Sequence, residues 1–222
     1  MFYETRKNEH GLAYDPFKSC VVPRPIGWIS TVSPSGIPNL APYSQFQNLT
    51  FDPPYVMFSA NQKTDGTRKD SVNNAEQTGE FVYNMATYDL RDAVNVSAQQ
   101  VSPEEDEFDL AGVTKAPSSL VKPFRVEESP IQFECRYYQT LRLPGKGRMG
   151  TVDVVIGEVL GVHIKDEFIG ADGKVDIVKI RPLARLGYYD YAFVDSVFEM
   201  AIPGRDEEVR IGMEGAANKL RS

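Results

Sequence analysis

The pattern of apolar and polar positions near the start of the chain predicts strands separated by turns. Residues 26–32 form an apolar run rich in β-branched and aromatic side chains, and Pro34-Ser35-Gly36 then predicts a turn. A second extended segment continues to about Leu49. After the break at Pro53-Pro54, residues 55–58 have the composition of a buried strand. We therefore expect three strands in this part of the chain.

Residues 43–48 of the second extended segment place polar groups on both faces of the strand, because successive side chains point to opposite sides. Ser44, Phe46 and Asn48 share one of these faces. One explanation is an edge strand exposed to solvent. The other is a ligand that needs several hydrogen bonds.

The pattern becomes helical after the turn predicted at Asp65-Gly66. We expect a helix over residues 68–78 that is capped by Thr67 and ends at Gly79, because glycine tolerates the left-handed backbone at a helix C-terminus. Asp70, three residues after Thr67, fits a short variant of the capping box.

The start of this helix carries groups that suit a phosphate. Free backbone N–H groups are joined there by the hydroxyls of Thr67 and Ser71 and by the positive charges of Arg68 and Lys69. The simpler alternative is a capped surface helix that binds nothing and whose charges are only solvated. The strand-rich segment before it, with its Ser, Asn and Gln side chains, favours the phosphate interpretation.

Helical spacing predicts a second helix over residues 88–99, whose apolar face we assign to packing. The acidic segment 102–113 is expected to be a solvated loop with a short helix that begins at Pro103. Three later strands are expected, over residues 131–141, 151–165 and 175–180.

Glycines shape the interpretation of these later strands. Gly157 and Gly161 predict bends or bulges of the kind that barrel closure requires. Residues 144–147 contain Lys and Gly but no Walker pattern, so we interpret them as a hairpin turn. The glycine fingerprint of a dinucleotide-binding Rossmann domain is absent, and such a domain is not expected.

Composition limits the classes of function. The 222 residues carry a formal charge of -7, which disfavours nucleic acid as a partner, and no apolar run is long enough to cross a membrane. The two cysteines, Cys20 and Cys135, form neither a disulfide framework nor a metal motif, and the expected location is a reducing cytoplasm. We expect Cys20 to be buried beside two valines.

Few residues suggest acid–base chemistry. His163 lies in an apolar strand and is expected to be packed, and Trp28 is expected in the core or an interface. Arg24 could reach a ligand anion, but a surface salt bridge is the more ordinary interpretation. No triad, nucleophile elbow or metal-ligand spacing is present in the sequence. This pattern favours chemistry supplied by a cofactor over hydrolysis.

Several segments together resemble one known family over roughly residues 17–195. They are RPIGWIST, NLAPYSQFQN, YVMFSA, RKDS, TGEFVYN, SPIQFECRYYQT, TVDVVIGEVLGVHI and RPLARLGYYDY. Their order and spacing are similar to those of the flavin-reductase-like family of FMN-binding split barrels. The resemblance implies a mostly β split β-barrel with flanking α-helices, which forms a homodimer with FMN near the subunit interface. We divide the chain into an arm (1–17), this domain (18–200) and a tail (201–222).

The resemblance also implies the residues that hold FMN. Thr67, Lys69 and Ser71 are expected at the phosphate, with Arg68 assisting, while Asp70 is expected to cap the helix or to meet the ribityl hydroxyls. The ring and the ribityl chain are assigned to the following residues: Ser44, Phe46, Asn48, Ser59, Ala60, Asn61 and Tyr189.

The implied reaction is the reduction of flavin by NADH or NADPH, with reduced flavin or electrons passed to a partner such as a monooxygenase. No catalytic side chain is assigned, because the flavin carries the hydride chemistry. Two alternatives remain open: a non-catalytic FMN carrier or sensor on the same barrel, and a flavin-free barrel that acts as an interaction module.

Overall fold

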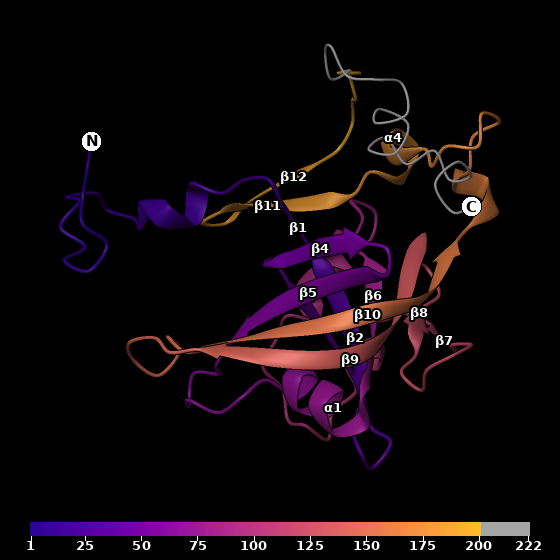
Figure 1. The fold of residues 1–222 in the computed structure, drawn as a ribbon, viewed down its shortest axis with the longest axis horizontal. Coiled ribbons are helices and arrows are strands. Elements are labelled where there is room, and N and C mark those ends of the chain that lie inside the picture. Colours follow the sequence, from indigo (N-terminus) through magenta and orange to yellow (C-terminus); the bar gives the residue numbers. More distant parts are fainter. Residues whose placement is uncertain (201–222) are drawn as a thin grey trace.

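The chain folds mainly into antiparallel β-structure, as the sequence predicts, and the computed structural model describes residues 1–200 (Figure 1). Seven strands form one sheet in the order β3-β2-β6-β9-β10-β5-β4. They are β2 (Gly27–Val32), β3 (Pro38–Tyr43), β4 (Phe46–Phe51), β5 (Pro54–Asn61), β6 (Glu80–Met85), β9 (Ile131–Leu143) and β10 (Val152–Ile164). The predicted tail over residues 201–222 lies outside the described residues.

The two edge strands of this sheet are consecutive in the sequence, so the sheet has to curl back on itself. β3 ends at Tyr43 and β4 begins at Phe46, yet they occupy opposite edges. Ser44 and Gln45 span the gap, and the N–H of Ser59 in β5 donates to the Gln45 carbonyl at 2.9 Å. The second extended segment is therefore two strands and not one, because the chain turns from one edge to the other.

The long strands β9 and β10 confirm the predicted strands over residues 131–141 and 151–165, and residues 144–147 lie in the connection between them. The register between β9 and β10 shifts next to Gly157 and Gly161, as these two glycines predicted. A Cβ atom at Gly157 would lie 2.3 Å from the ring of Phe81. Close packing therefore requires glycine at this bulge.

The interior contains two apolar clusters. The first lies within the curled sheet and includes Phe58 and Phe81, whose rings meet edge to face with centroids 5.4 Å apart. The second lies under the helices α2 (Arg91–Val96) and α3 (Glu107–Ala111) and contains Trp28. Trp28 is fully buried and its Nε1–H donates to Ser97 Oγ at 2.8 Å, which confirms the predicted core position.

The first helix, α1 (Asp70–Thr78), lies beside β2, below the sheet in Figure 1. It ends at Gly79 with a left-handed φ of 78°, as predicted. Its start differs from the prediction. Thr67 does not cap the helix, because its hydroxyl donates to Asp65 Oδ1 at 2.6 Å, and Lys69 occupies the N-cap position without a side-chain hydrogen bond.

The other helices also begin or end differently from the sequence expectation. α2 is shorter than residues 88–99, because after Val96 the N–H groups of Ala98 and Gln99 donate to carbonyls only three residues earlier. α3 begins after Asp106, whose carboxylate accepts from the Phe108 N–H at 2.9 Å, and not at Pro103. The predicted strand over residues 175–180 is instead α4 (Ile177–Ile180), because Asp176 accepts from the Lys179 N–H and caps a helical turn.

A small sheet and the N-terminal residues form a second layer above the barrel in Figure 1. The sheet has the order β1-β11-β12, and residues 1–15 extend away from it beyond the short helix η1 (Pro16–Ser19), at the left of Figure 1. The remaining elements are β1 (Arg24–Pro25), β7 (Lys115–Ala116), β8 (Arg125–Val126), β11 (Leu183–Gly187), β12 (Asp190–Phe193), η1 (Pro16–Ser19) and η2 (Asp166–Phe168).

Two expectations for this layer are wrong. Cys20 is exposed and not buried, because the chain from η1 to β1 runs over the surface. Arg24 makes no salt bridge to any of residues 1–200; its Nη1 donates instead to the carbonyls of Lys18 at 2.8 Å and Val21 at 2.7 Å. The Arg24 side chain therefore ties the start of the domain to β1.

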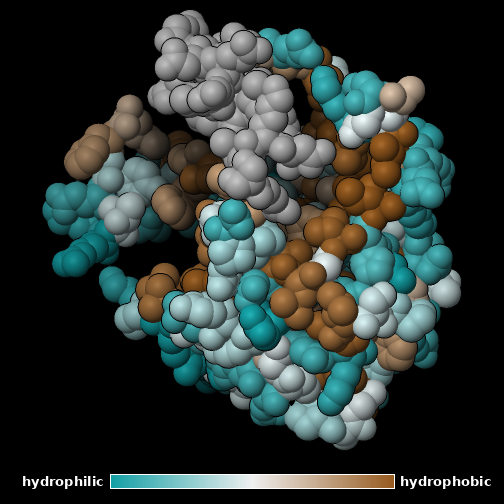
Figure 2. All heavy atoms as spheres, turned by 45° about the vertical axis from the view of Figure 1, so that its right-hand side comes forward, coloured by the Kyte–Doolittle hydropathy of each residue, from teal (hydrophilic) through white to brown (hydrophobic). Residues whose placement is uncertain are grey.

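The surface keeps several large apolar side chains in contact with solvent. Figure 2 shows apolar residues gathered on one face between polar surroundings. The N-terminal residues contribute to the exposed apolar surface of the chain, with Phe2, Tyr14 and Phe17 all largely exposed. Exposed aromatic side chains of this size are typical of surfaces that contact another molecule.

Candidate functional site

Two adjoining cavities lie where the ends of β3 and β5 meet the start of α1. The smaller, which we call the inner pocket, has a volume of roughly 210 Å³ and is walled by β3, β5, the start of α1 and the segment between α2 and α3. The larger, the outer cavity, has a volume of roughly 830 Å³ and reaches to the N-terminal residues and β11. They share Ser44 and Asn61, so an elongated ligand could occupy both.

Lys69 gives the inner pocket its positive charge. Its side chain is half-buried beside the start of α1 and forms no ion pair with a carboxylate of residues 1–200. Burial, and then the nearby charge of Lys63, lowers the pKa of Lys69 below its ordinary value. A half-buried ammonium without a carboxylate partner attracts an anionic ligand.

The backbone at the start of α1 adds donors to this positive charge. The first helical hydrogen bonds are made by the N–H groups of Val72 and Asn73, which both donate to the Lys69 carbonyl. The N–H groups of Asp70 and Ser71 precede them and remain outside the helical ladder. Lys63 Nζ lies 2.7 Å from Asp70 Oδ2 and neutralises the carboxylate that would repel an anion.

The opposite wall of the inner pocket is polar but uncharged. Ser44, Ser59 and Asn61 line it, and Asn61 is held by a hydrogen bond from its Nδ2 to the Met149 carbonyl at 2.9 Å. Met149 belongs to the connection between β9 and β10, so this hairpin contributes to the pocket. The wall offers hydroxyl and amide groups to a polar chain.

A buried carboxylate forms part of the pocket, which the sequence did not indicate. Glu107 is 5% exposed and accepts hydrogen bonds from Asn39 Nδ2 at 2.7 Å and from the Leu40 N–H at 3.0 Å. Burial raises the pKa of Glu107. Because Glu107 lies in an acidic segment, the sequence suggested a solvated side chain. The only sign of an ordered helix start was the neighbouring Asp106, a residue type that commonly caps helices.

The structure brings six of the predicted site residues to the two cavities. Ser44, Ser59, Asn61, Lys69 and Asp70 line the inner pocket, and Tyr189 lines the outer cavity although its side chain is largely exposed. These residues come from β3–β4, β5, α1 and β11–β12. The cavities therefore combine segments that are far apart in the sequence.

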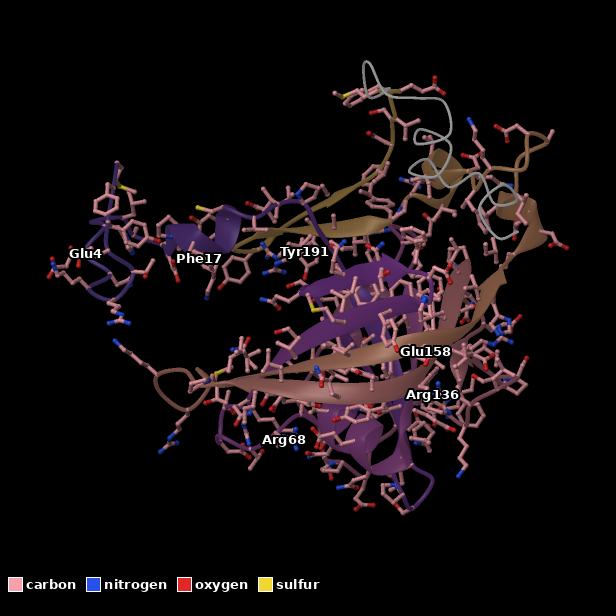
Figure 3. The ribbon with its side chains drawn as sticks, in the orientation of Figure 1. Glu4, Phe17, Arg68, Arg136, Glu158 and Tyr191 are labelled. Carbon is pink, nitrogen blue, oxygen red and sulfur yellow. The ribbon has the colours of Figure 1, made fainter. Side chains whose placement is uncertain are left out.

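Arg68 and Thr67 are not brought to these cavities. The guanidinium of Arg68 binds both carboxylate oxygens of Glu76, at 2.6 and 2.7 Å, and Asp153 at 3.1 Å, below the sheet in Figure 3. The hydrogen bond to Glu76 raises the pKa of Arg68. Thr67 is bound to Asp65. The cation that the pocket receives from this segment is therefore Lys69.

Four other predicted residues also lie outside the cavity walls. Ser71 is buried and donates to Asn39 Oδ1 at 2.7 Å, while Phe46 stacks on Tyr83 with ring centroids 4.4 Å apart. Ala60 points into the apolar core, and Asn48 is exposed on the edge strand β4. Strand alternation accounts for Ala60, which lies between Ser59 and Asn61 and therefore faces the other side of β5.

Other candidate chemistry in the described part of the chain is structural. His163 Nε2 lies 2.5 Å from Glu134 Oε1, and Glu134 also accepts from the Ser119 N–H, which agrees with the predicted packed histidine. Among residues 1–200, no group of three or more His, Cys, Asp or Glu residues could hold a metal ion. No described helix combines the length and the apolar character that a membrane span needs.

Comparison with known proteins identifies the family. The flavin reductase like domain matches residues 19–194, which is most of the chain. The chain belongs to the flavin reductase like family. The FMN-binding protein from Thermus thermophilus has a TM-score of 0.66 at 14% identity, and the match covers 86% of this chain and 98% of that one. An uncharacterized protein of Aquifex aeolicus is 35% identical over 195 residues, which cover 87% of this chain and 96% of that protein.

Solved structures of the family share the fold. The nitrilotriacetate monooxygenase component B from Bacillus cereus has a TM-score of 0.82 at 28% identity, and the match covers 90% of this chain and 98% of that one. A split-barrel protein of flavin reductase type from Shewanella frigidimarina has a TM-score of 0.72 at 22% identity, with 90% and 94% covered. The predicted mostly β split barrel is therefore confirmed.

The donor set at the inner pocket fits the phosphate of FMN. The half-buried Lys69 ammonium and the free N–H groups at the start of α1 suit a phosphate, and Ser59 and Asn61 offer partners for a ribityl chain. In the outer cavity the Nε of Arg24 is buried without a hydrogen-bond partner among the described residues. An unpaired buried donor is costly unless a ligand accepts from it.

Proposed function

We propose that this protein is an NAD(P)H-dependent flavin oxidoreductase that binds FMN in the inner pocket and outer cavity. The observation that carries the proposal is the half-buried Lys69 at the start of α1, which has no carboxylate partner within residues 1–200 and faces a polar wall. Lys69 and the N–H groups of Asp70 and Ser71 hold the phosphate. Ser44, Ser59 and Asn61 orient the rest of the molecule.

When bound, FMN supplies the ring that accepts a hydride, so the chain needs no acid–base residue of its own. The role of the protein is to bind and orient. The outer cavity is wide enough for a second ligand beside a flavin, because its volume is roughly 830 Å³. Tyr189 and Arg24 line this cavity and are placed to contact the ring or the donor.

The proposal includes a homodimer and a partner that receives reduced flavin or electrons, such as a monooxygenase. The largely exposed Phe2, Tyr14 and Phe17 support the dimer, because a second copy would cover apolar side chains that now contact solvent. Tyr14 and Phe17 also line the outer cavity. A dimer formed through these residues would place the subunit interface beside the flavin.

Steady-state oxidation of NADH and NADPH by the purified protein, with and without added FMN, tests the activity. The proposal expects FMN-dependent oxidation of at least one nucleotide. Lys69→Ala is expected to require more FMN for half-maximal rate, while Lys174→Ala, a change at an exposed loop lysine, leaves this concentration unchanged. Stoichiometric FMN retention with negligible oxidation of both nucleotides would instead indicate a flavin carrier.

A further inference from the structure

A third cavity, of roughly 480 Å³, lies between α2 and the strands β11 and β12. Within the described residues it shares no lining residue with the inner pocket. It shares five with the outer cavity: Val94, Asn95, Arg185, Tyr189 and Tyr191. In Figure 3, Tyr191 lies on β12 close to the point where the N-terminal residues meet the small sheet. A ligand in the outer cavity therefore has an adjoining compartment, which we call the arginine–tyrosine pocket.

Aromatic rings provide the walls of this pocket. Tyr88 and Phe193 pack with ring centroids 4.5 Å apart, and Tyr191 belongs to the neighbouring part of β12. Arg181 holds the first two rings in place, because its guanidinium carbon lies 4.3 Å from the Tyr88 centroid and 4.8 Å from that of Phe193. Tyr191, which carries only Arg185 over its ring among the described residues, is the wall that favours a planar aromatic ligand.

Two further arginines give the pocket its charge. The guanidinium carbon of Arg91 lies 4.3 Å from the centroid of Tyr88, and that of Arg185 lies 4.4 Å from the centroid of Tyr191. Each guanidinium is held over a ring, and its N–H groups can still donate to a ligand. Arg91 Nη1 donates to the Tyr88 carbonyl, and Arg185 Nη2 donates to the Tyr188 carbonyl. Each retains further donors, since a guanidinium has five.

Among residues 1–200, the lining contains one acidic side chain, Asp92, which is 90% exposed and lies 3.8 Å from Arg91. Two arginines and one exposed carboxylate leave a positive pocket on a chain whose formal charge is -7. A local charge opposite to that of the whole molecule favours an anion. Planar walls and a positive charge together select one class of ligand.

We propose that the arginine–tyrosine pocket binds a planar aromatic group that carries a phosphate or carboxylate. This inference rests on the proposed function, since the pocket opens onto the cavity assigned to the flavin and its electron donor. Two sources share the chemistry: the phosphorylated adenosine end of the nucleotide donor, and a separate aromatic acid. Arg91 and Arg185 bind the anion. Tyr191 stacks against the ring, because Tyr88 is already covered by Arg91, Arg181 and Phe193.

Calorimetric titration of the FMN-loaded protein with 5′-AMP, 2′,5′-ADP, benzoate and neutral benzamide tests the inference. We expect at least one anion to bind at least about tenfold more tightly than benzamide, because a charge-assisted hydrogen bond contributes about that factor. Competition of an adenosine phosphate with NADH or NADPH identifies the nucleotide as the source. Binding of benzoate without such competition identifies an aromatic acid.

Arg91→Ala is the most specific variant, because Arg91 lines this pocket and neither of the other two cavities. It is expected to weaken the anion about tenfold and to leave the FMN affinity unchanged. Arg136→Ala, at an exposed arginine paired with Glu158 on β9 and β10, is the matched control and should leave both affinities unchanged (Figure 3).

Failure of this inference and failure of the proposed function are distinguishable. If FMN binds and is reduced but no anion binds more tightly than benzamide, the inference is wrong and the flavin assignment stands. An unchanged anion affinity in Arg91→Ala also overturns it. If FMN does not bind, the proposed function is wrong, and titration of the flavin-free protein with the same anions still decides the inference.

Discussion

Glu107 accepts a hydrogen bond from Asn39 Nδ2 at 2.7 Å, and this contact joins α3 to β3 at the inner pocket. Asn39 in turn accepts from Ser71 Oγ, in the first turn of α1, at 2.7 Å. The start of the helix that is proposed to hold phosphate is therefore fixed to α3 through the buried side chains of Asn39 and Glu107. A substitution in this network should therefore change both the free energy of unfolding and the shape of the inner pocket.

The buried carboxylate makes the free energy of unfolding depend on pH. Because burial raises the pKa of Glu107 above its ordinary value of 4.5, the folded protein binds its proton more tightly than the unfolded chain. The contribution of Glu107 to stability therefore falls as the pH rises from the ordinary value through the raised one. We expect Glu107→Gln to gain stability relative to the unaltered protein over that window.

Urea unfolding of both proteins at a series of pH values measures this difference. The glutamine offers one acceptor where the carboxylate offers two, so the variant carries a constant penalty that does not depend on pH. Only the change with pH reports on ionisation. A difference that stays constant across the window would show that Glu107 titrates alike in the folded and unfolded protein.

Removal of the amide at Asn39 tests the network itself. Asn39→Ala is expected to lower the free energy of unfolding by about 1–3 kcal/mol for each buried partner left unsatisfied, because Glu107 and Ser71 would both lose a hydrogen bond. The affinity for FMN should fall as well, since the start of α1 loses its anchor. Gln77→Ala, at an exposed position of α1, is the control. An Asn39→Ala protein with undiminished stability would contradict the network.

Substitution of Lys69 should affect the affinity for FMN, whereas substitution of its neighbour Arg68 should affect the free energy of unfolding. Lys69→Ala is expected to weaken FMN about tenfold or more and to leave the fold intact, because it removes a charge from the pocket and no ion pair with residues 1–200. Arg68→Ala is expected to lower the free energy of unfolding by about 3 kcal/mol, because Asp153 is buried beside it. Fluorescence titration with FMN and urea unfolding separate the two effects. Equal loss of FMN affinity in both variants would contradict the structural roles.

The N-terminal residues should control assembly. A chain that lacks residues 1–15 is expected to shift from dimer to monomer, because the exposed Phe2 and Tyr14 are proposed to be covered by the second copy. Light scattering after size-exclusion chromatography measures the mass of the particle. A truncated chain that remains a dimer, or a full chain that is already a monomer at the same concentration, would contradict this role.

The strands were predictable because their signals are local. A continuous run of apolar, β-branched and aromatic residues located β2. The strands β9 and β10 were also located, and the glycines of β10 indicated its bulges. Helix starts were less predictable, because several side chains compete for the same donors. Asp65 binds the hydroxyl of Thr67, and the sequence gives no sign that this contact replaces a cap.

The candidate site was only partly predictable for a different reason. Lys69 could be found from its position before a helix, but the inward direction of Glu107 depends on β3, which lies far away in the sequence. The separation of Arg68 from the pocket likewise depends on Asp153 in β10. Contacts between distant segments decide which of two adjacent cations faces the ligand.

The visible absorption spectrum of the protein with FMN, recorded anaerobically before and after NADH and then NADPH, tests the central claim most directly. We predict that the protein shows a bound-flavin spectrum and that at least one nucleotide bleaches it. The Lys69→Ala variant should show this spectrum only at a higher FMN concentration. A bound spectrum that neither nucleotide bleaches would contradict the reductase activity and favour a carrier. A spectrum identical to that of free FMN would contradict the flavin site itself.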